Sequence, residues 1–378
     1  MNAGPDGLTV CHITTVHPMF DIRVFYLECQ TLARSGYDVA LVIRHARDEV
    51  IDGVRICALP DPANRLSRMV LLNARAFARA LRERAAVYHF HDPELLMVGL
   101  ALRCLGKTVI YDVHEDVPRD VLEKEWIPRG LRRVTAQVVE IVENFLARRM
   151  SRLIVVTPYI LNRFTTLGCT AVDVRNYPML TELHCPDVTW AEKERAVCYV
   201  GAISGFRGLF EMVDAIERTD GRLLLAGRFS PLAERDLAAA RPGWKQVDEL
   251  GLLSREGVRR TLRRSVAGLA VTHPNPNLIN ALLIKIFEYM AAGIPVIASS
   301  FPVWKEIVEG NACGLCVDPL NPRAIAEAIQ WMFDHPAEAE RMGANGRRAV
   351  ETRYNWDSES AKLLSTYSEL IAQGASAR

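Results

Sequence analysis

The sequence of 378 residues lacks several signals that would place it in a common class of proteins. It contains no run of 18 apolar residues, so no membrane-spanning helix is expected. Its first residues show no basic segment followed by an apolar one, which argues against a secretory signal. No Gly-x-Gly-x-x-Gly motif follows the first expected strand, which argues against a dinucleotide oxidoreductase. Asp-x-Asp is also absent, so a metal clamp built on that motif has no ligands.

Composition gives broad limits on partners and compartment. The formal net charge is only +1, so nothing global suggests a nucleic-acid or polyanion partner. The nine cysteines are odd in number and scattered, which suits a reducing cytoplasm. A hydrophobic content of 49% in a chain of this length allows two domains, each with a sizeable core. We therefore expect a two-domain cytoplasmic protein.

The first half begins with a strand, a helix and a second strand. Residues 8–13 and 39–43 are expected to be buried strands, and Asp21 could cap the helix between them. This order and length predict a right-handed parallel crossover. The connecting loop contains Asp21 and Arg23 at the carboxyl edge of the first strand, where open parallel sheets bind ligands. The alternative is a capped loop with a surface arginine.

Two further strands are each expected to end in a histidine motif. His91 and Asp92 follow the strand at 87–90, and His114 and Glu115 follow the strand at 108–111. Because the carboxyl ends of parallel strands meet at one sheet edge, these polar groups should point into the same crevice. A single histidine would more often be structural, whereas two at strand ends indicate a site.

The second half starts a new α/β series at residue 196, after a proline-containing linker. Its first strand ends in a turn with Gly205 before Arg207. Glycines at a strand-to-helix turn let the backbone approach a phosphate, and an arginine can neutralise its charge.

Residues 273–300 are expected to form a loop, a helix through 279–291 and a short buried strand. Lys285 and Glu288 lie three positions apart in this otherwise apolar helix. A charge there needs a partner or a polar ligand. The helix N-terminus could also receive a phosphate. The alternative is a solvated i,i+3 pair.

The segment from Lys285 to Ser299 resembles the nucleotide-sugar-binding element of retaining GT-B glycosyltransferases of family 4, the group 1 transferases. The run His-Asp-Pro-Glu-Leu-Leu from His91 and the downstream His-Glu at His114 resemble one subgroup of them. The resemblance implies an α/β GT-B fold with two Rossmann-like, parallel-sheet domains facing a central cleft. It implies an acceptor-side domain at 1–178, a linker at 179–195, a donor domain at 196–355, and a helix at 356–378 that crosses back.

The resemblance also implies roles in donor binding. Glu288 would bind the ribose hydroxyls and Leu253 the nucleobase, while Arg207 with Gly205 would hold the diphosphate. The family pattern is a first glutamate, seven residues and then the second glutamate, which is Glu288 here. Asn280 stands at the first position, where the family's glutamate contacts the donor sugar. The resemblance to this subgroup, or a position at the strand edge, indicates further site residues. Lys285 fits a subgroup that has a lysine three positions before the second glutamate. His114 would lie against the donor sugar. The acceptor-side residues would be Asp21, Arg23, His91, Asp92 and Glu115.

The function implied is transfer of a sugar, with retention, from a nucleoside diphosphate sugar to a glycan, lipid-linked or small-molecule acceptor. A UDP-sugar is favoured, with a GDP-sugar next, and no metal or other cofactor is expected. The catalytic candidates are His114, Arg207 and Lys285. Two alternatives stay open: a non-transferring GT-B enzyme such as a nucleotide-sugar epimerase, and a weakly active partner subunit of another transferase, which Asn280 makes conceivable.

Residues 129–152 are expected to form a long helix with arginines at both ends and an apolar stripe through Val138, Ile141, Val142 and Phe145. Such a helix could rest on anionic lipid, which would place the protein at the inner face of the membrane as a peripheral partner. The commoner arrangement is a helix that covers the sheet with its charges outside.

Overall fold

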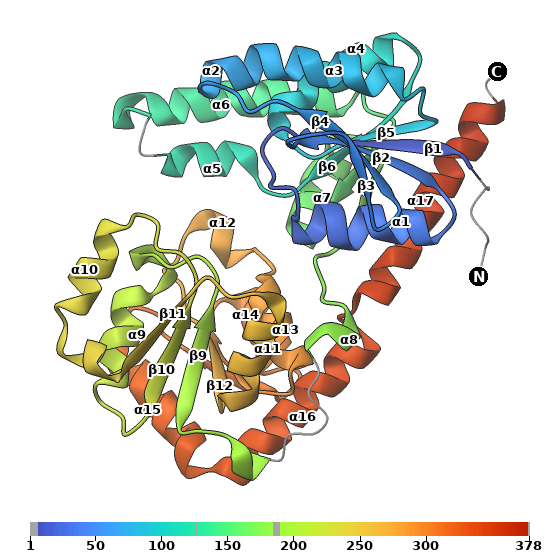
Figure 1. The fold of residues 1–378 in the computed structure, drawn as a ribbon. Helices are drawn as coiled ribbons and strands as arrows, with labels where there is room; N and C mark the ends of the chain where they lie inside the picture. The colour runs from blue at the N-terminus through green and yellow to red at the C-terminus, as the bar shows by residue number, and fades with distance from the viewer. Residues whose placement is uncertain (1–6, 125–126, 184–189, 377–378) are drawn as a thin grey trace. The chain divides into compact units, whose positions relative to one another are not determined.

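The computed structural model describes residues 7–124, 127–183 and 190–376. The chain divides into two compact units, shown in Figure 1. The N-terminal unit comprises Met1–Asn176 together with Asp357–Arg378, and the C-terminal unit comprises Tyr177–Trp356. The last helix of the chain therefore belongs to the unit in which the chain begins.

The N-terminal unit is built on an eight-stranded sheet of order β3-β4-β2-β1-β5-β6-β7-β8. All neighbours pair in parallel except β3 and β4, and the parallel pairing predicted for the first two long strands is confirmed. The strands are β1 (Thr9–Ile13), β2 (Asp38–Arg44), β3 (Glu49–Ile51), β4 (Val54–Leu59), β5 (Val87–Phe90), β6 (Thr108–Val113), β7 (Arg152–Val155) and β8 (Ala171–Asp173).

Helices connect the parallel strands of this sheet. The first is capped as predicted, since a carboxylate oxygen of Asp21 accepts hydrogen bonds from the N–H groups of Arg23 and Val24. The helical segments are η1 (Ile22–Cys29), α1 (Gln30–Arg34), α2 (Arg65–Ser67), η2 (Arg68–Leu72), α3 (Asn73–Arg82), η3 (Pro93–Leu95), α4 (Leu96–Cys104), α5 (Val117–Glu123), α6 (Arg129–Ala147), α7 (Pro158–Thr166) and α17 (Trp356–Ser376).

The C-terminal unit has a six-stranded parallel sheet of order β11-β10-β9-β12-β13-β14. Its strands are β9 (Ala196–Val200), β10 (Arg222–Ala226), β11 (Val247–Gly251), β12 (Ala267–Ala270), β13 (Val296–Ser299) and β14 (Gly314–Val317). Its helical segments are α8 (Leu180–Leu183), η4 (Trp190–Glu192), η5 (Gly205–Arg207), α9 (Leu209–Ile216), α10 (Ala233–Ala239), η6 (Pro242–Gln246), α11 (Arg255–Arg264), α12 (Pro276–Ile279), α13 (Ile284–Ala291), α14 (Pro302–Val308), α15 (Pro322–Asp334) and α16 (Pro336–Thr352).

Two expectations about helices were wrong. The helix expected through 279–291 is interrupted, because Leu283 is extended and the indole N–H of Trp304 donates to the carbonyl of Ala281 in the break. The expected helix at 129–152 ends at Ala147, and Arg152 already begins β7.

The linker expected at 179–195 contains α8 and η4, and residues 184–189 lie outside the described part of the chain. Among the described residues, no helix is both long enough and apolar enough to cross a bilayer.

Candidate functional site

The N-terminal unit carries a buried polar cluster at the centre of its sheet. His12 on β1 lies opposite His89 on the neighbouring β5, and β6 follows β5 in the sheet order. Beyond the end of β5 lies His91, while Asp112 lies at the end of β6. The three histidines and Asp112 are all at most 2% exposed. Adjacent parallel strands therefore bring together the groups that the sequence spreads over about one hundred residues.

Arg23 is the cation of this cluster. Its guanidinium donates two parallel hydrogen bonds to Asp112, at 2.8 and 2.9 Å, and lies 3.0 Å from Glu28. It also donates to the carbonyl of Val174, 2.9 Å away. Burial alone would raise the pKa of Asp112, but Arg23 and the His114 ring hold that pKa well below its usual range. Arg23 is only 3% exposed, so in this structure it fixes the carboxylates of the cluster.

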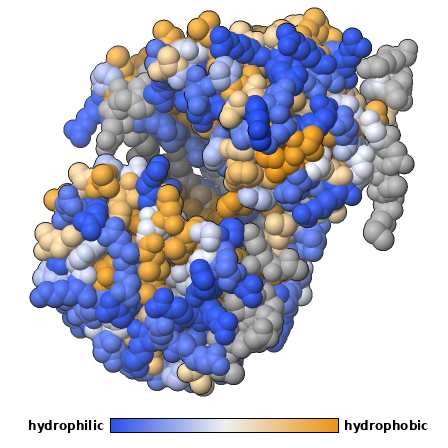
Figure 2. Space-filling view, in the orientation of Figure 1, coloured by the Kyte–Doolittle hydropathy of each residue, from blue (hydrophilic) through white to orange (hydrophobic). Residues whose placement is uncertain are grey.

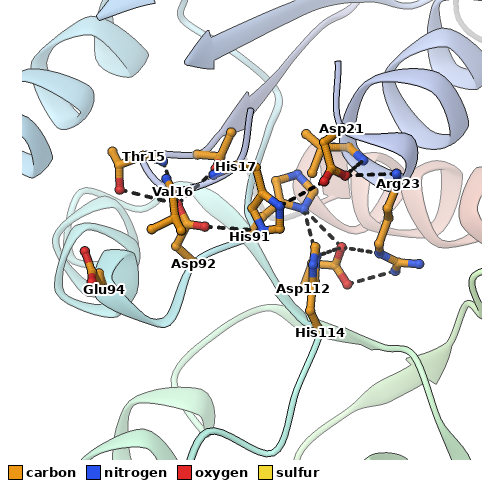
Figure 3. A network of polar contacts seen from close by, with 12 residues as sticks. Thr15, Val16, His17, Asp21, Arg23, His91, Asp92, Glu94, Asp112 and His114 are labelled. Atoms are coloured by element: carbon orange, nitrogen blue, oxygen red, sulfur yellow. Dashed lines mark hydrogen bonds and ion pairs between the residues drawn. The ribbon is translucent and has the colours of Figure 1, made fainter. Parts of the chain in front are cut away.

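His114 lies at the accessible side of the cluster, with a side chain that is 16% exposed. Its Nε2 is 2.8 Å from Asp112 Oδ2, and His91 Nδ1 is 3.1 Å from the same oxygen (Figure 3). Burial lowers the pKa of His91 to about 4, although Asp112 acts in the opposite direction. His91 is therefore neutral near neutral pH. Its hydrogen bonds depend on which ring nitrogen carries the proton.

A chain of hydrogen bonds continues from His91 into the core. His91 Nε2 is 2.9 Å from His12 Nδ1, and His12 Nε2 is 2.9 Å from the hydroxyl of Tyr367 on α17. The same hydroxyl is 2.8 Å from His89 Nδ1. Burial also lowers the pKa of His12 and His89 well below the usual range, so both rings are neutral.

The proton on each bond of this chain follows from donor and acceptor roles. The Asp112 carboxylate can only accept, so His91 donates to it through Nδ1–H and keeps a lone pair on Nε2. His12 must then donate through Nδ1–H, which leaves its Nε2 to accept from the Tyr367 hydroxyl. The Tyr367 oxygen in turn accepts from His89. All four bonds run toward Asp112.

A loop after β1 completes the cluster. One carboxylate oxygen of Asp92 accepts from the backbone N–H groups of Thr15 and Val16, at 2.5 and 3.2 Å (Figure 3). His17 lies between two carboxylates, 3.2 Å from Asp21 and 3.5 Å from Asp92. Burial is the largest single effect and disfavours the charged ring, but the hydrogen bond to Asp21 and the negative charges of Asp92 and Asp21 together raise the pKa of His17. The same His17 ring lowers the pKa of Asp21 to about 2, against the effect of burial.

In the described part of the chain, two sets of side chains offer donor atoms close enough to surround a cation: His12, Glu28, His89 and His91 in one, and His91, Asp112 and His114 in the other. In both sets the guanidinium of Arg23 already contacts the carboxylate. A divalent cation would therefore lie beside a permanent positive charge, which disfavours its binding. The donor set fits an internal hydrogen-bonded network better than a metal centre.

The C-terminal unit carries a second polar group, at the start of α13. Lys285 is 7% exposed, and its Nζ has no hydrogen-bond partner among the described residues. This ammonium lies 3.4 Å from the ring centroid of Tyr199, a cation–π contact. Burial lowers the pKa of Lys285 well below its usual value, and Arg207 adds to the effect, while Glu288 opposes it. A buried cation without a hydrogen-bonding acceptor is suited to an anionic ligand.

Glycines bring the backbone of the neighbouring turn close to Lys285. A Cβ on Gly201 would lie 3.2 Å from Lys285 Nζ, so the ammonium closely approaches the main chain there. Gly208 has φ +77°, and a Cβ on it would meet the Val271 carbonyl oxygen at 2.4 Å. Between the two glycines, Arg207 ends η5 and is half-buried. The N–H of Gly205 donates to Glu234, 2.6 Å away.

Glu288 has a partner that the sequence did not reveal. It is 7% exposed, and its Oε1 accepts from a guanidinium N–H of Arg255 at 2.7 Å. Asn280 lies in the break between α12 and α13 and is half-buried. Leu253 is half-buried before the first turn of α11, where it packs close to Gly257. The break also means that α13 begins at Ile284, directly before Lys285, and its N-cap residue supplies no side-chain hydrogen bond.

The predicted site residues thus fall into two groups, one in each unit. The structure brings Asp21, Arg23, His91 and His114 into one network, whereas Glu115 forms no hydrogen bond or ion pair with it among the described residues. Sequence reasoning missed six members of the two groups: His12, Glu28, His89, Asp112, Arg255 and Tyr367. The alternation of histidines in Tyr88-His89-Phe90-His91 was a usable signal, because it is unusual for a buried strand.

Comparison with known families identifies the class. Residues 182–349 match the family profile of glycosyl transferases group 1, and residues 23–178 match that of the glycosyl transferase 4-like domain. Together the two matches take in most of both units. The chain belongs to the group 1 glycosyltransferases, and its two parallel-sheet α/β domains are those of the GT-B fold. The family and fold implied by the sequence are confirmed.

Among characterised relatives, the D-rhamnosyltransferase WbpZ of Pseudomonas aeruginosa is 28% identical over 277 residues, which cover 71% of this chain and 68% of that protein. Sucrose-phosphate synthase from Thermosynechococcus elongatus has a similar structure, with a TM-score of 0.79 and 21% identity over 97% of this chain and 100% of that one. HepE from Anabaena, solved in complex with UDP-glucose, gives a TM-score of 0.73 at 15% identity, over 96% of this chain and 100% of that one.

Proposed function

We propose that this transferase moves a sugar from a nucleoside diphosphate sugar to a glycan, lipid-linked or small-molecule acceptor, with retention of anomeric configuration. One observation carries the proposal: the buried ammonium of Lys285, which lacks a hydrogen-bond partner among the described residues and lies near the guanidinium of Arg207. The two positive charges repel each other, and a diphosphate bound between them would stabilise both.

The proposed donor is a UDP-sugar, with a GDP-sugar as the next candidate. The similarity in fold to HepE, which was solved with UDP-glucose, supports the first choice. In the proposed complex, Arg207 and Lys285 contact the diphosphate beside the backbone of Gly205. Glu288 accepts from the ribose hydroxyls, Leu253 packs on the base, and Asn280 contacts the donor sugar.

The proposed chemistry needs no metal ion. When the bond between the sugar and the diphosphate breaks, negative charge develops on the leaving phosphate, and Arg207 and Lys285 stabilise it electrostatically. The incoming acceptor hydroxyl attacks from the face that the phosphate leaves, and its proton passes to that phosphate. His114 is proposed to contact the donor sugar, held in orientation by Asp112.

The acceptor is proposed to bind the N-terminal unit near the half-buried His17 and the strand ends. Asp21, Arg23, His91, Asp92 and Glu115 are the acceptor-side residues of the proposal. For Arg23, His91 and Asp92 the contacts described above support a positioning role, because each is at most 3% exposed.

The test is a donor screen followed by product analysis. Thermal denaturation is measured with UDP-, GDP- and dTDP-sugars, each in the presence of EDTA, and the stabilising donor is then offered with candidate acceptors. We expect a rise in the unfolding temperature with one donor class. We also expect transfer that survives EDTA, and a product whose anomeric coupling in NMR matches that of the donor.

Other results would overturn parts of the proposal. Inversion at the anomeric carbon would contradict retention, and loss of transfer with EDTA would contradict metal independence. Conversion of the donor without any acceptor would instead identify a nucleotide-sugar epimerase. Donor binding with no turnover, in a stable complex with a second transferase, would identify a partner subunit.

A further inference from the structure

The ammonium of Lys285 is buried against an aromatic ring rather than paired with a carboxylate. Hydrophilic residues cover much of the visible surface in Figure 2, whereas Lys285 is only 7% exposed. The carboxylate of the same helix, Glu288, is already paired with Arg255 at 2.7 Å. Among the described residues, Lys285 Nζ has no hydrogen-bond partner. Its closest neighbour of opposite polarity is the face of the Tyr199 ring, whose centroid lies 3.4 Å away.

Lys285 reaches this ring around the end of a strand. Successive side chains of a strand point to opposite faces of the sheet. On β9, Cys198 packs on the same face as α13, whereas Tyr199 belongs to the core of the other face. The lysine side chain therefore passes the carboxyl end of β9, where a Cβ on Gly201 would lie 3.2 Å from Nζ. Lysines ordinarily extend their ammonium into water, but this one ends at the sheet edge where parallel sheets bind ligands.

The hydroxyl of Tyr199 lies near the second cation of the proposed donor site. It donates to the carbonyl of Ala202 at 2.7 Å, within the turn that leads to Arg207. Burial raises the pKa of Tyr199 to about 12, although the nearby guanidinium of Arg207 acts in the opposite direction. One side chain thus contacts Lys285 through its ring face and approaches Arg207 through its hydroxyl.

An aromatic face suits a cation that must also bind a ligand. The negative face of the ring attracts the ammonium and stabilises its charge. A carboxylate would stabilise the charge as well, but it would accept hydrogen bonds from the ammonium and compete with a phosphate for them. The ring leaves the three N–H donors of Lys285 without an acceptor among the described residues.

We propose that Tyr199 is a positioning residue of the donor site, whose ring holds the Lys285 ammonium at the sheet edge with its N–H groups directed to the diphosphate. The hydroxyl of Tyr199 fixes the turn that carries Arg207. This role rests on the proposed function of Lys285 in donor binding. Because the ring acts through the charge of Lys285, changing the ring face should weaken binding of a nucleoside diphosphate and leave binding of the nucleoside unchanged.

The test replaces Tyr199 by phenylalanine and by pentafluorophenylalanine. The two rings have similar shapes, but fluorination reverses the charge on the ring face, so only phenylalanine attracts a cation. Calorimetry with UDP and with uridine compares the two proteins, both with Lys285 and in the Lys285→Met background. The control is the same pair of replacements at Tyr88, which is fully buried on β5 of the other unit.

We expect the protein with pentafluorophenylalanine at position 199 to bind UDP about tenfold more weakly than Tyr199→Phe, and both to bind uridine equally. In the Lys285→Met background the two rings should give equal UDP affinities, because the charge on which the ring acts is gone. The pair at Tyr88 should show no difference.

Two results of the calorimetry would overturn the proposal, and they differ in their reach. Equal UDP affinities of the two Tyr199 replacements, with Lys285 present, would remove Tyr199 from the donor site and leave the role of Lys285 intact. Undiminished UDP affinity of Lys285→Met alone would remove Lys285 from the site, and Tyr199 with it.

A measurement on the parent needs no change at Tyr199. The protons on Cε of Lys285 lie close to the ring face, so their NMR signal should be displaced upfield and should be missing from Lys285→Met. The carbon-13 shift of Cε follows the pKa of Lys285, which should be lower with pentafluorophenylalanine than with phenylalanine. Arg207, Glu288 and Cys198, which also influence this pKa, are the same in both proteins. A Lys285 signal at the ordinary position in the parent would overturn the proposal.

Discussion

The hydroxyl of Tyr367 lies 2.9 Å from Nε2 of His12, although 355 positions separate the two residues in the sequence. It also lies 2.8 Å from His89 Nδ1, so one hydroxyl joins two buried imidazoles. The last helix thus completes the polar core of the unit that β1 begins. The chain of bonds that it completes ends on Asp112, the partner of His114.

We predict that Tyr367→Phe lowers the free energy of unfolding by about 2–3 kcal/mol. The ring still packs, but His12 and His89 each lose a buried partner, and an unpaired buried group costs roughly 1–3 kcal/mol. Urea denaturation measures the loss. Nitrogen-15 NMR of labelled histidine rings should show His12, His89 and His91 with the proton on Nδ1 in the parent, and a changed His12 ring in the variant.

Tyr37→Phe is the matched control for this prediction. Tyr37 is buried beside Tyr367, with ring centroids 5.9 Å apart, but its hydroxyl has no hydrogen-bond partner among the described residues. Its removal should leave the free energy of unfolding unchanged or slightly higher. If the two tyrosine variants were equally unstable, the hydrogen-bonded chain would have no special energetic role.

The stability of the protein should fall as the pH drops from about 6.5 toward 4. Burial lowers the pKa of His12, His89 and His91, that of His91 to about 4, so the unfolded chain binds protons in this range before the folded one does. Each such group reduces the free energy of unfolding by up to about 1.4 kcal/mol per pH unit.

Two carboxyl groups act in the opposite direction. Burial raises the pKa of Glu28 and of Glu143, so the folded chain holds protons that the unfolded chain has already lost. Three groups against two leave a net loss of up to about 1.4 kcal/mol per pH unit. Glu28→Gln removes one opposing group and should steepen the slope by about 1.4 kcal/mol per unit. Urea titrations at several pH values measure both slopes, and a flat profile for the parent would contradict the neutral state of the imidazoles.

Arg23→Met should destabilise the N-terminal unit by about 3–5 kcal/mol, because it leaves the buried carboxylate of Asp112 without its cation. Arg34→Met on α1 is the control. Arg34 is exposed and, among the residues that the structure describes, donates only to the Gln30 side chain, so we expect a change within about 0.5 kcal/mol. Similar losses for the two arginine variants would show that Arg23 has no structural role.

Local chemistry allowed much of the fold to be predicted from the sequence. The strands at β1, β5, β6 and β13 are apolar and short, and the Asp21 cap and the parallel crossover follow from residues close together in the chain. The break between α12 and α13 was not predictable in this way. It depends on the Trp304 indole, which lies more than twenty positions away and binds the Ala281 carbonyl.

The candidate sites likewise contain residues that local sequence indicates and partners that it does not. His91, His114, Lys285 and Glu288 stand in local motifs, so the sequence singles them out. Their partners come from elsewhere in the chain: Arg255 reaches Glu288 from α11, and Tyr367 reaches the imidazoles from the far end of the sequence. Pairings of this kind are set by the packing of whole elements, which no short motif records.

Glu288→Gln should weaken donor binding by about 2–3 kcal/mol, or roughly 30- to 150-fold, if its carboxylate accepts from the ribose hydroxyls in a desolvated site. The fold should change little, because the Arg255 partner is partly exposed and such pairs contribute only about 0–1 kcal/mol. Glu256→Gln, an exposed carboxylate on the neighbouring α11, should leave donor affinity unchanged. Calorimetric titration with UDP-glucose compares the three proteins, and equal affinities would remove Glu288 from the donor site.

The central claim is that Lys285 is a buried cation kept for the diphosphate of the donor. Calorimetry with UDP and with uridine, on the parent and on Lys285→Met, tests it most directly. We predict that Lys285→Met is at least as stable as the parent, because an unpaired buried ammonium is costly, yet binds UDP at least tenfold more weakly while uridine binding is unchanged. Undiminished UDP affinity in Lys285→Met would contradict the account.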